Sequence, residues 1–128
     1  MKKGVENWLN SAQYDLETAE HMFKAGRYIY TVFMCHLSLE KVMKAKVEEI
    51  TDTTPPKTHD LEYLLGLGEL SPDKDMEKFL VELSNLSVVT RYPSDFQRML
   101  GDFSKGRAES ILIKTKEVFQ WIKKSIAL

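Results

Sequence analysis

At 128 residues and 14.8 kDa the chain has the length of one domain, long enough to bury a core without disulfide or metal staples. Its 43% hydrophobic and 29% charged residues, with a net charge of −1, argue against an intrinsically disordered protein. A single cysteine, Cys35, excludes a disulfide framework, and no apolar run or signal-peptide pattern indicates a membrane protein or an exported one. We therefore expect a cytoplasmic protein.

Apolar residues at helical spacing predict two helices in the first half of the chain. The first runs from about residue 5 to 25 and stops at Gly26. The second, the longest, runs from about 27 to 50. The stretch 51–58 contains two prolines and several turn-forming residues, which end helical structure there.

Capping signals predict the start of the next two helices. Thr58 is the expected N-cap of a short third helix. A serine, a proline and an acid at 71–73 form a start signal for a fourth helix, which ends before Arg91.

The remaining chain is expected to contain one loop and one helix. We expect the loop over 93–104 and a fifth helix from about 105 to 127. No segment alternates with the period of a strand. The sequence thus predicts a single all-α domain over residues 1–128, an up-and-down bundle of four long helices plus one short helix.

The charge is unevenly distributed. Residues 51–90 carry three basic and eight acidic residues, whereas residues 91–128 carry eight basic and four acidic ones. The basic C-terminal third suits an anion such as RNA or a nucleotide. The spacing of its lysines, however, favours the solvated side of a helix.

Charged residues also occur where a core helix should be apolar. Asp15 lies on or beside the apolar stripe of the first helix, and His36, Glu40 and Lys44 follow one another at four-residue spacing on the second. One interpretation is a ladder on the surface with a buried histidine. The other is a polar cluster at the edge of the core, in which these residues and Arg91 neutralise one another and form a ligand site.

Searches for catalytic and cofactor motifs fail. The chain has no GxGxxG, Walker-type, HExxH or GxSxG motif. Its three histidines are far apart in sequence, and none forms an i,i+4 metal pair with another. We expect no metal site and no cofactor, and we expect Cys35 to be a buried structural thiol.

Three stretches together resemble one family. They are WLNSAQYDLETA from Trp8, the segment 26–45 with its CHLSLEKVMKA portion, and the pair formed by THDL from Thr58 and RYP from Arg91. In this order they are similar to the HEPN domain (higher eukaryotes and prokaryotes nucleotide-binding), over about residues 5–126.

The resemblance implies a bundle of four or five helices, often a homodimer. It also implies similarity to the helical C-terminal domain of kanamycin nucleotidyltransferase, and a minimal nucleotidyltransferase as partner in a toxin–antitoxin pair. Many HEPN toxins are metal-independent RNases with an Arg-x4–6-His motif. No arginine of this chain has a histidine at that distance, so general-base catalysis lacks its usual residue.

Three functions follow as alternatives. The first is a HEPN binding module without catalysis, which binds a nucleotide, a phosphate group or RNA, or docks a nucleotidyltransferase. The second is an RNase toxin with a displaced active site, which recruits His36 or His59. The third is a structural adaptor that only dimerises. The candidate ligand-binding residues are Asp15, His36, Glu40, Lys44, Arg91 and Tyr92.

The aromatic residues of the sequence also predict a homodimer. Trp121 lies off the apolar stripe of the last helix, and Tyr28, Tyr30 and Tyr92 exceed what a small core holds. Aromatic residues of this kind are favoured at protein interfaces.

Overall fold

The structure is a computed structural model that describes residues 1–92 and 94–127. Within these ranges the chain forms helices only, and the four long helices that the sequence predicts are present. In chain order the helices are α1 (Lys3–Lys24), α2 (Tyr28–Thr51), α3 (Leu61–Leu67), α4 (Lys74–Arg91), α5 (Phe96–Asp102) and α6 (Lys105–Lys124).

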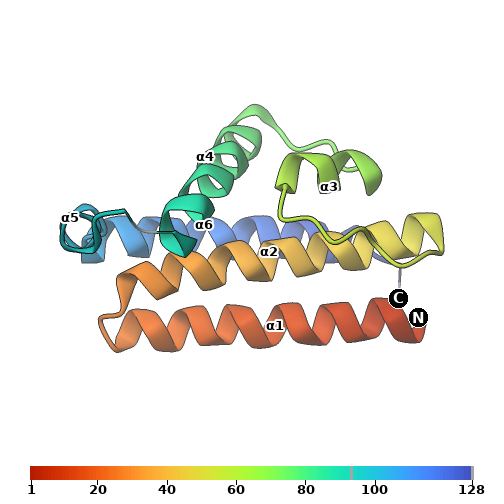
Figure 1. The fold of residues 1–128 in the computed structure, drawn as a ribbon. Coiled ribbons are helices and arrows are strands. Elements are labelled where there is room, and N and C mark those ends of the chain that lie inside the picture. The colour runs from red at the N-terminus through yellow and green to blue at the C-terminus, as the bar shows by residue number, and fades with distance from the viewer. Residues whose placement is uncertain (93, 128) are drawn as a thin grey trace.

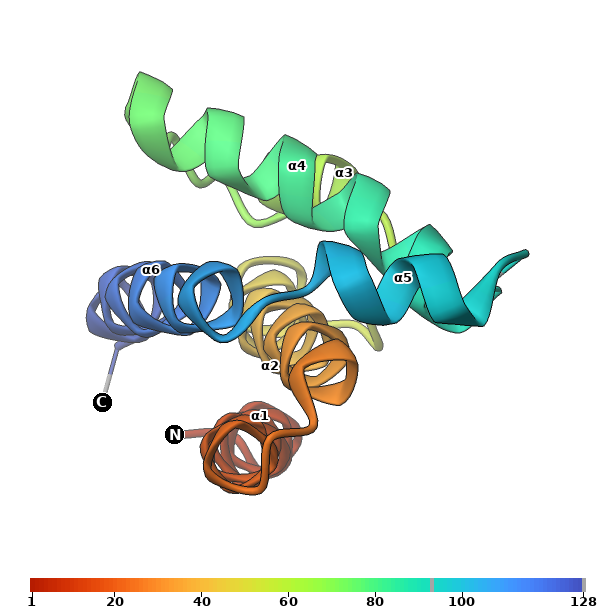
Figure 2. The same cartoon turned by 90° about the vertical axis from the view of Figure 1, so that its left-hand side faces the viewer.

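The long helices alternate in direction along the chain, as an up-and-down bundle requires. Figure 1 shows α1, α2 and α6 side by side, with both chain ends at the same end of the bundle. The view in Figure 2 shows α4 crossing obliquely over α2, on the side away from α1. The predicted all-α bundle is therefore confirmed. None of the described helices is both long and apolar enough to span a membrane.

Helix α2 is the central element of the fold. It packs against all five other helices, so its core positions, such as Val32, Leu39 and Met43, are completely buried. Helix α1 covers one side of α2 through Ala12, Leu16 and Ala19, whose spacing of four and three residues places them on one face. This central position explains why α2 also carries the polar groups of the candidate site.

Two predicted helix starts are wrong by two residues. Asp60, not Thr58, is the N-cap of α3, because its carboxylate accepts the backbone N–H groups of Glu62 and Tyr63. In α4 the cap is Asp73, not a residue at 71, since the Asp73 carboxylate accepts the N–H of Met76 at 2.8 Å. In both cases the acidic side chain outcompetes the nearby hydroxyl for the free N–H groups of the first turn.

The expected loop over 93–104 contains the additional helix α5, which is a correction. Asp95 caps it by accepting the N–H of Arg98 at 3.1 Å. Met99 and, just beyond the helix, Phe103 are buried against the core at the helical spacing of four residues. Pro93, which the sequence placed at the start of this segment, lies outside the described residues.

The four aromatic residues from which a dimer was expected divide into two pairs. Tyr28 and Trp121 are half-buried and pack against the core. Tyr30 and Tyr92 are exposed, at 55% and 77% of their surface. Both lie near the end of the bundle where α5 is found, and this end therefore has unburied aromatic surface.

Candidate ligand-binding site

The six candidate site residues do not form one cluster. Asp15 is buried, but its partner is Lys41, whose Nζ lies 2.8 Å from Asp15 Oδ2, and not Lys44 or Arg91. Lys41 also donates to Ser11 Oγ at 2.9 Å. This pair links α1 to α2 on the side away from α4, so Asp15 does not belong to the same site as Arg91.

Glu40 is the centre of a second group of polar residues. Its side chain is buried, and Lys44 Nζ donates to its Oε2 at 3.1 Å, as the four-residue spacing predicted. His59, in the segment before α3, donates from Nδ1 to the other carboxylate oxygen at 2.7 Å. Lys44 lies 5.5 Å from the ring centroid of Trp8, so its charge also faces an aromatic surface.

His36 is completely buried and neutral at physiological pH. Burial lowers the pKa of His36 to about 4, and the positive charge of Arg91 acts in the same direction, whereas Glu40 opposes it. Its Nε2 faces the carbonyl oxygen of His59 at 3.1 Å and must donate there. Its unprotonated Nδ1 has no hydrogen-bond partner in the described chain, and its 3.9 Å separation from Glu40 is not an ion pair.

Arg91 occupies the end of α4 and lies beside the Glu40 group. Its guanidinium carbon lies 4.8 Å from the ring centroid of Phe33, which is one turn before His36 on α2. The side chain forms no ion pair with Asp15 or Glu40, so the interpretation of Arg91 as the residue that neutralises these acids is wrong. Its Nε and Nη2 atoms are buried without a hydrogen-bond partner among the described residues.

Arg91 and Tyr92 line a pocket of about 430 Å³ at the α5 end of the bundle. Apart from Thr90, the rest of the lining is apolar or aromatic, and its exposed walls include Tyr30 and Phe96. Its lining residues are Ile29, Tyr30, Phe33, Thr90, Arg91, Tyr92, Phe96 and Met99. The site thus combines one cationic group without an acceptor and several aromatic faces.

The sequence did not identify four residues of these arrangements. Phe96 carried no motif, and Lys41 and Tyr30 belonged to the family-like segment 26–45 without being assigned to a site. His59 was considered only as a histidine recruited for catalysis, and a contact 19 residues away from Glu40 leaves no local signal. The aspartate at 60 and the prolines at 55 and 56 are the only hints that the backbone at His59 has a defined conformation.

The other chemical candidates are structural. Burial raises the pKa of the Cys35 thiol to about 12, so this cysteine is not a reactive thiolate. Among residues 1–92 and 94–127 no group of three or more histidine, cysteine or acidic side chains is arranged to hold a metal ion. On α6, Lys114 and Lys116 approach Glu117 and Glu20 at 3.5 and 3.4 Å, which favours a solvated helix face over a phosphate-binding one.

Comparison with known proteins assigns the fold to a family. The model of the HEPN domain matches residues 5–126, so the chain belongs to the HEPN family. Two crystal structures share its fold with a TM-score of 0.79 each and cover 98% of this chain and 100% of their own. They are TT1696 from Thermus thermophilus, at 16% identity, and ST0689, described as an archaeal HEPN homologue, at 20% identity. No curated protein sequence matches the chain.

Proposed function

We propose that this HEPN protein is a binding module whose pocket at Arg91 binds an anionic ligand, a nucleotide or a phosphate group of RNA. The observation that carries the proposal is the guanidinium of Arg91, which lines the pocket without any acceptor among the described residues. A partly buried cation without a partner has lost solvation and gained no compensating contact. An anion in the pocket supplies that contact.

The surroundings of Arg91 favour a ligand that has both a charged and a flat apolar part. The ring of Phe33 lies against the guanidinium. Tyr30, Tyr92 and Phe96 line the pocket and offer aromatic faces on which a base stacks. A guanidinium held in this way presents a fixed positive charge to a phosphate group.

Titration calorimetry with ATP and with a short single-stranded RNA tests this proposal. Arg91→Ala is expected to weaken binding by about tenfold to a hundredfold, since a charge-assisted contact contributes about 1.5–3 kcal/mol. Arg107→Ala is the matched control, because Arg107 also stacks on a phenylalanine, at 4.9 Å from Phe103, but lies outside the pocket. If the wild type binds neither ligand at millimolar concentration, the protein is a structural adaptor.

A displaced RNase site remains the second candidate, and one observation favours it. His59 donates from Nδ1 to the carboxylate of Glu40, so in neutral His59 the other ring nitrogen, Nε2, is unprotonated. The His59 side chain is 61% exposed. This is the arrangement of a carboxylate-oriented general base. The primary proposal expects RNA to stay intact with metal-free protein. If the wild type cleaves RNA and both His59→Gln and Arg91→Ala abolish the cleavage, the RNase function replaces the binding-module proposal.

Partner binding completes the proposal. We infer that the chain forms a homodimer and docks a minimal nucleotidyltransferase, with which it forms a toxin–antitoxin pair. Family membership and the exposed aromatic residues at the α5 end support this. Co-expression with the nucleotidyltransferase of a neighbouring gene tests the second partner, and a failure to co-purify would leave only the ligand-binding function.

A further inference from the structure

A second cavity lies next to the Arg91 pocket, between the start of α2 and helix α5. Its volume is about 200 Å³. Figure 2 shows α5 beside the start of α2, and the two helices pack against each other. The cavity shares Ile29, Tyr30 and Phe96 with the Arg91 pocket. The two hollows are therefore neighbouring parts of one surface, and a single ligand can occupy both.

The walls of the second cavity are almost entirely apolar. Four of its lining residues are aromatic, namely Tyr28, Tyr30, Phe96 and Phe103. Phe103 is almost completely buried and lies at the inner end, whereas Phe96 and Leu100 leave 49% and 48% of their surface exposed. Exposed apolar surface beside a cavity favours a ligand that covers it. Since a dry apolar cavity of about 150 Å³ holds benzene, the second cavity suits a flat ring system.

Charge favours an anionic ligand over a neutral one. Arg27, the N-cap residue of α2, is exposed and lines the second cavity. Arg91 supplies a second cation in the adjoining pocket. No acidic residue of the described chain lines either hollow. A ligand with a flat apolar part and a negatively charged part matches the two hollows together, and a nucleotide has both.

The neighbouring surfaces favour a free nucleotide over a nucleic-acid chain. Proteins that bind single-stranded RNA carry a positively charged groove that follows the backbone. Here Lys114 and Lys116 of α6 each approach a glutamate, at 3.5 and 3.4 Å. Residues 73–82, at the start of α4, contain four acids and two lysines. These surfaces do not continue the positive charge of Arg27 and Arg91.

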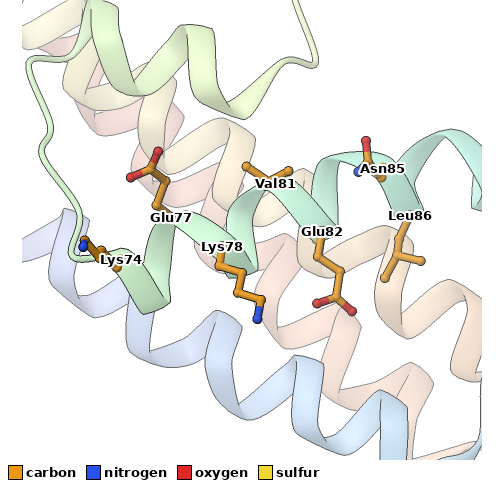
Figure 3. A pocket seen from close by; sticks show the side chains of 7 residues that line it. All are labelled: Lys74, Glu77, Lys78, Val81, Glu82, Asn85 and Leu86. Atoms are coloured by element: carbon orange, nitrogen blue, oxygen red, sulfur yellow. The ribbon is translucent and has the colours of Figure 1, made fainter.

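A hollow along α4 is a less suitable site, although its volume of about 590 Å³ is larger. In Figure 3 its side chains diverge, since Lys78 and Glu82 point toward α6 whereas Glu77 points to the opposite side of the helix. Two lysines and two glutamates line it, and none of its described lining residues is aromatic. It offers neither a net positive charge nor a face on which a base stacks.

We propose that the second cavity is the base-binding subsite of a free mononucleotide whose phosphates lie at Arg91. This rests on the proposed function and names the class of its ligand and the position of the base. The base passes Tyr30 and Phe96, which line both hollows, and lies against Leu100. Apart from Arg27 and two tyrosine hydroxyls, no polar side chain of the described residues lines the cavity. It therefore recognises a base by stacking and not by its hydrogen-bonding edge.

Titration calorimetry with ATP and with inorganic triphosphate separates the two parts of the site. The wild type is expected to bind ATP at least about tenfold more tightly than triphosphate, because a stacked base adds affinity of this order. Leu100→Trp places a larger side chain in the cavity wall, so it should weaken ATP binding by at least about fivefold and leave triphosphate binding unchanged. Ile113→Trp is the matched control, since Ile113 is similarly exposed, at 53%, but lies on α6 outside both hollows.

Photolabelling locates the base in the wild-type protein, without any variant. The probe is an ATP derivative that carries an azide on its adenine ring. Mass spectrometry is expected to find the label within residues 26–30 or 96–103, and an excess of ATP should prevent the labelling. A label confined to residues 74–86, along the hollow of α4, would overturn the assignment.

The titrations distinguish a failure of the subsite from a failure of the proposed function. Equal affinities of the wild type for ATP and triphosphate would refute the base subsite and leave Arg91 as an anion site. Short single-stranded RNA that binds at least about tenfold more tightly than ATP would replace the free nucleotide by a nucleic-acid chain. If neither ATP nor triphosphate binds, the subsite and the proposed function both fail.

Discussion

At the residue scale, burial alone does not identify a binding residue. Asp15, Glu40, Lys44 and His36 are all buried, yet the described structure supplies partners for each of their charges, and His36 avoids charge altogether. Arg91 differs because its guanidinium has a pocket beside it and no acceptor among the described residues. A charge without a partner, and not burial as such, therefore indicates where a ligand binds.

Removing Asp15 should destabilise the protein moderately. The variant Asp15→Ala is expected to lower the free energy of unfolding by about 1–2 kcal/mol, because Lys41 is a quarter exposed and keeps its contact with Ser11. This is less than the loss for a fully buried pair. A urea melt measures it, with the exposed Glu17→Ala on the same helix as a control that should change stability by less than about 0.5 kcal/mol.

Protonation of His36 should make the fold sensitive to acid. Its pKa of about 4 lies below the unfolded value near 6.5, so the unfolded state binds more protons between these values. The stability that His36 contributes is present above pH 6.5 and is lost as the pH falls toward 4, by up to about 3 kcal/mol. Urea midpoints from pH 7.5 to 4.5 measure this loss. His36→Gln should flatten the profile, and an equally steep profile would assign the effect to other groups.

At the scale of the element, the helix caps are set by competition between neighbouring side chains. Hydroxyl and carboxylate groups both accept backbone N–H groups, and a carboxylate in the first turn also gains from the positive end of the helix. This is why α3 and α4 begin after Asp60 and Asp73. It also explains why α5 forms in a segment that has the composition of a loop, since Asp95 is placed before Phe96 and Met99.

The cap of α4 gives a direct test. Asp73→Ala should cost about 1 kcal/mol, because the N–H of Met76 loses its acceptor. Ser71→Ala should cost less than about 0.5 kcal/mol, since Ser71 is exposed and lies outside the helix. Thermal melts of the two variants at the same concentration distinguish them. Equal losses would mean that the helix begins earlier.

At the scale of the whole molecule, α2 organises both the core and the site. All five other helices pack against it, and its row of Phe33, His36, Glu40 and Lys44 faces the segment at His59 and the end of α4. Pocket and polar group are therefore neighbours along one helix. Helix α5, which adds an outer wall of the site, packs less extensively against the rest of the bundle than α1 or α6.

Hydrogen exchange should show that the backbone amides of α5 are less protected than those of α2. The backbone amides of α5 are expected to exchange at least about a hundredfold faster than those in the middle of α2, because α5 has seven residues and buries only Met99. Mass spectrometry under native conditions measures the ratio. Equal protection of both helices would mean that a partner or a ligand covers α5.

The sequence alone determined the four long helices and the family. Apolar spacing and turn signals are local, so they placed the four long helices, and the ordered motifs indicated the HEPN fold. Glu40–Lys44 was predictable for the same reason, because a four-residue spacing on a helix is a contact. The tertiary structure decided the rest. The contact of His59 with Glu40 spans 19 residues. The pairing of Asp15 with Lys41 and the lack of an acceptor for Arg91 among the described residues depend on how the helices rotate and cross. No local sequence pattern encodes that arrangement.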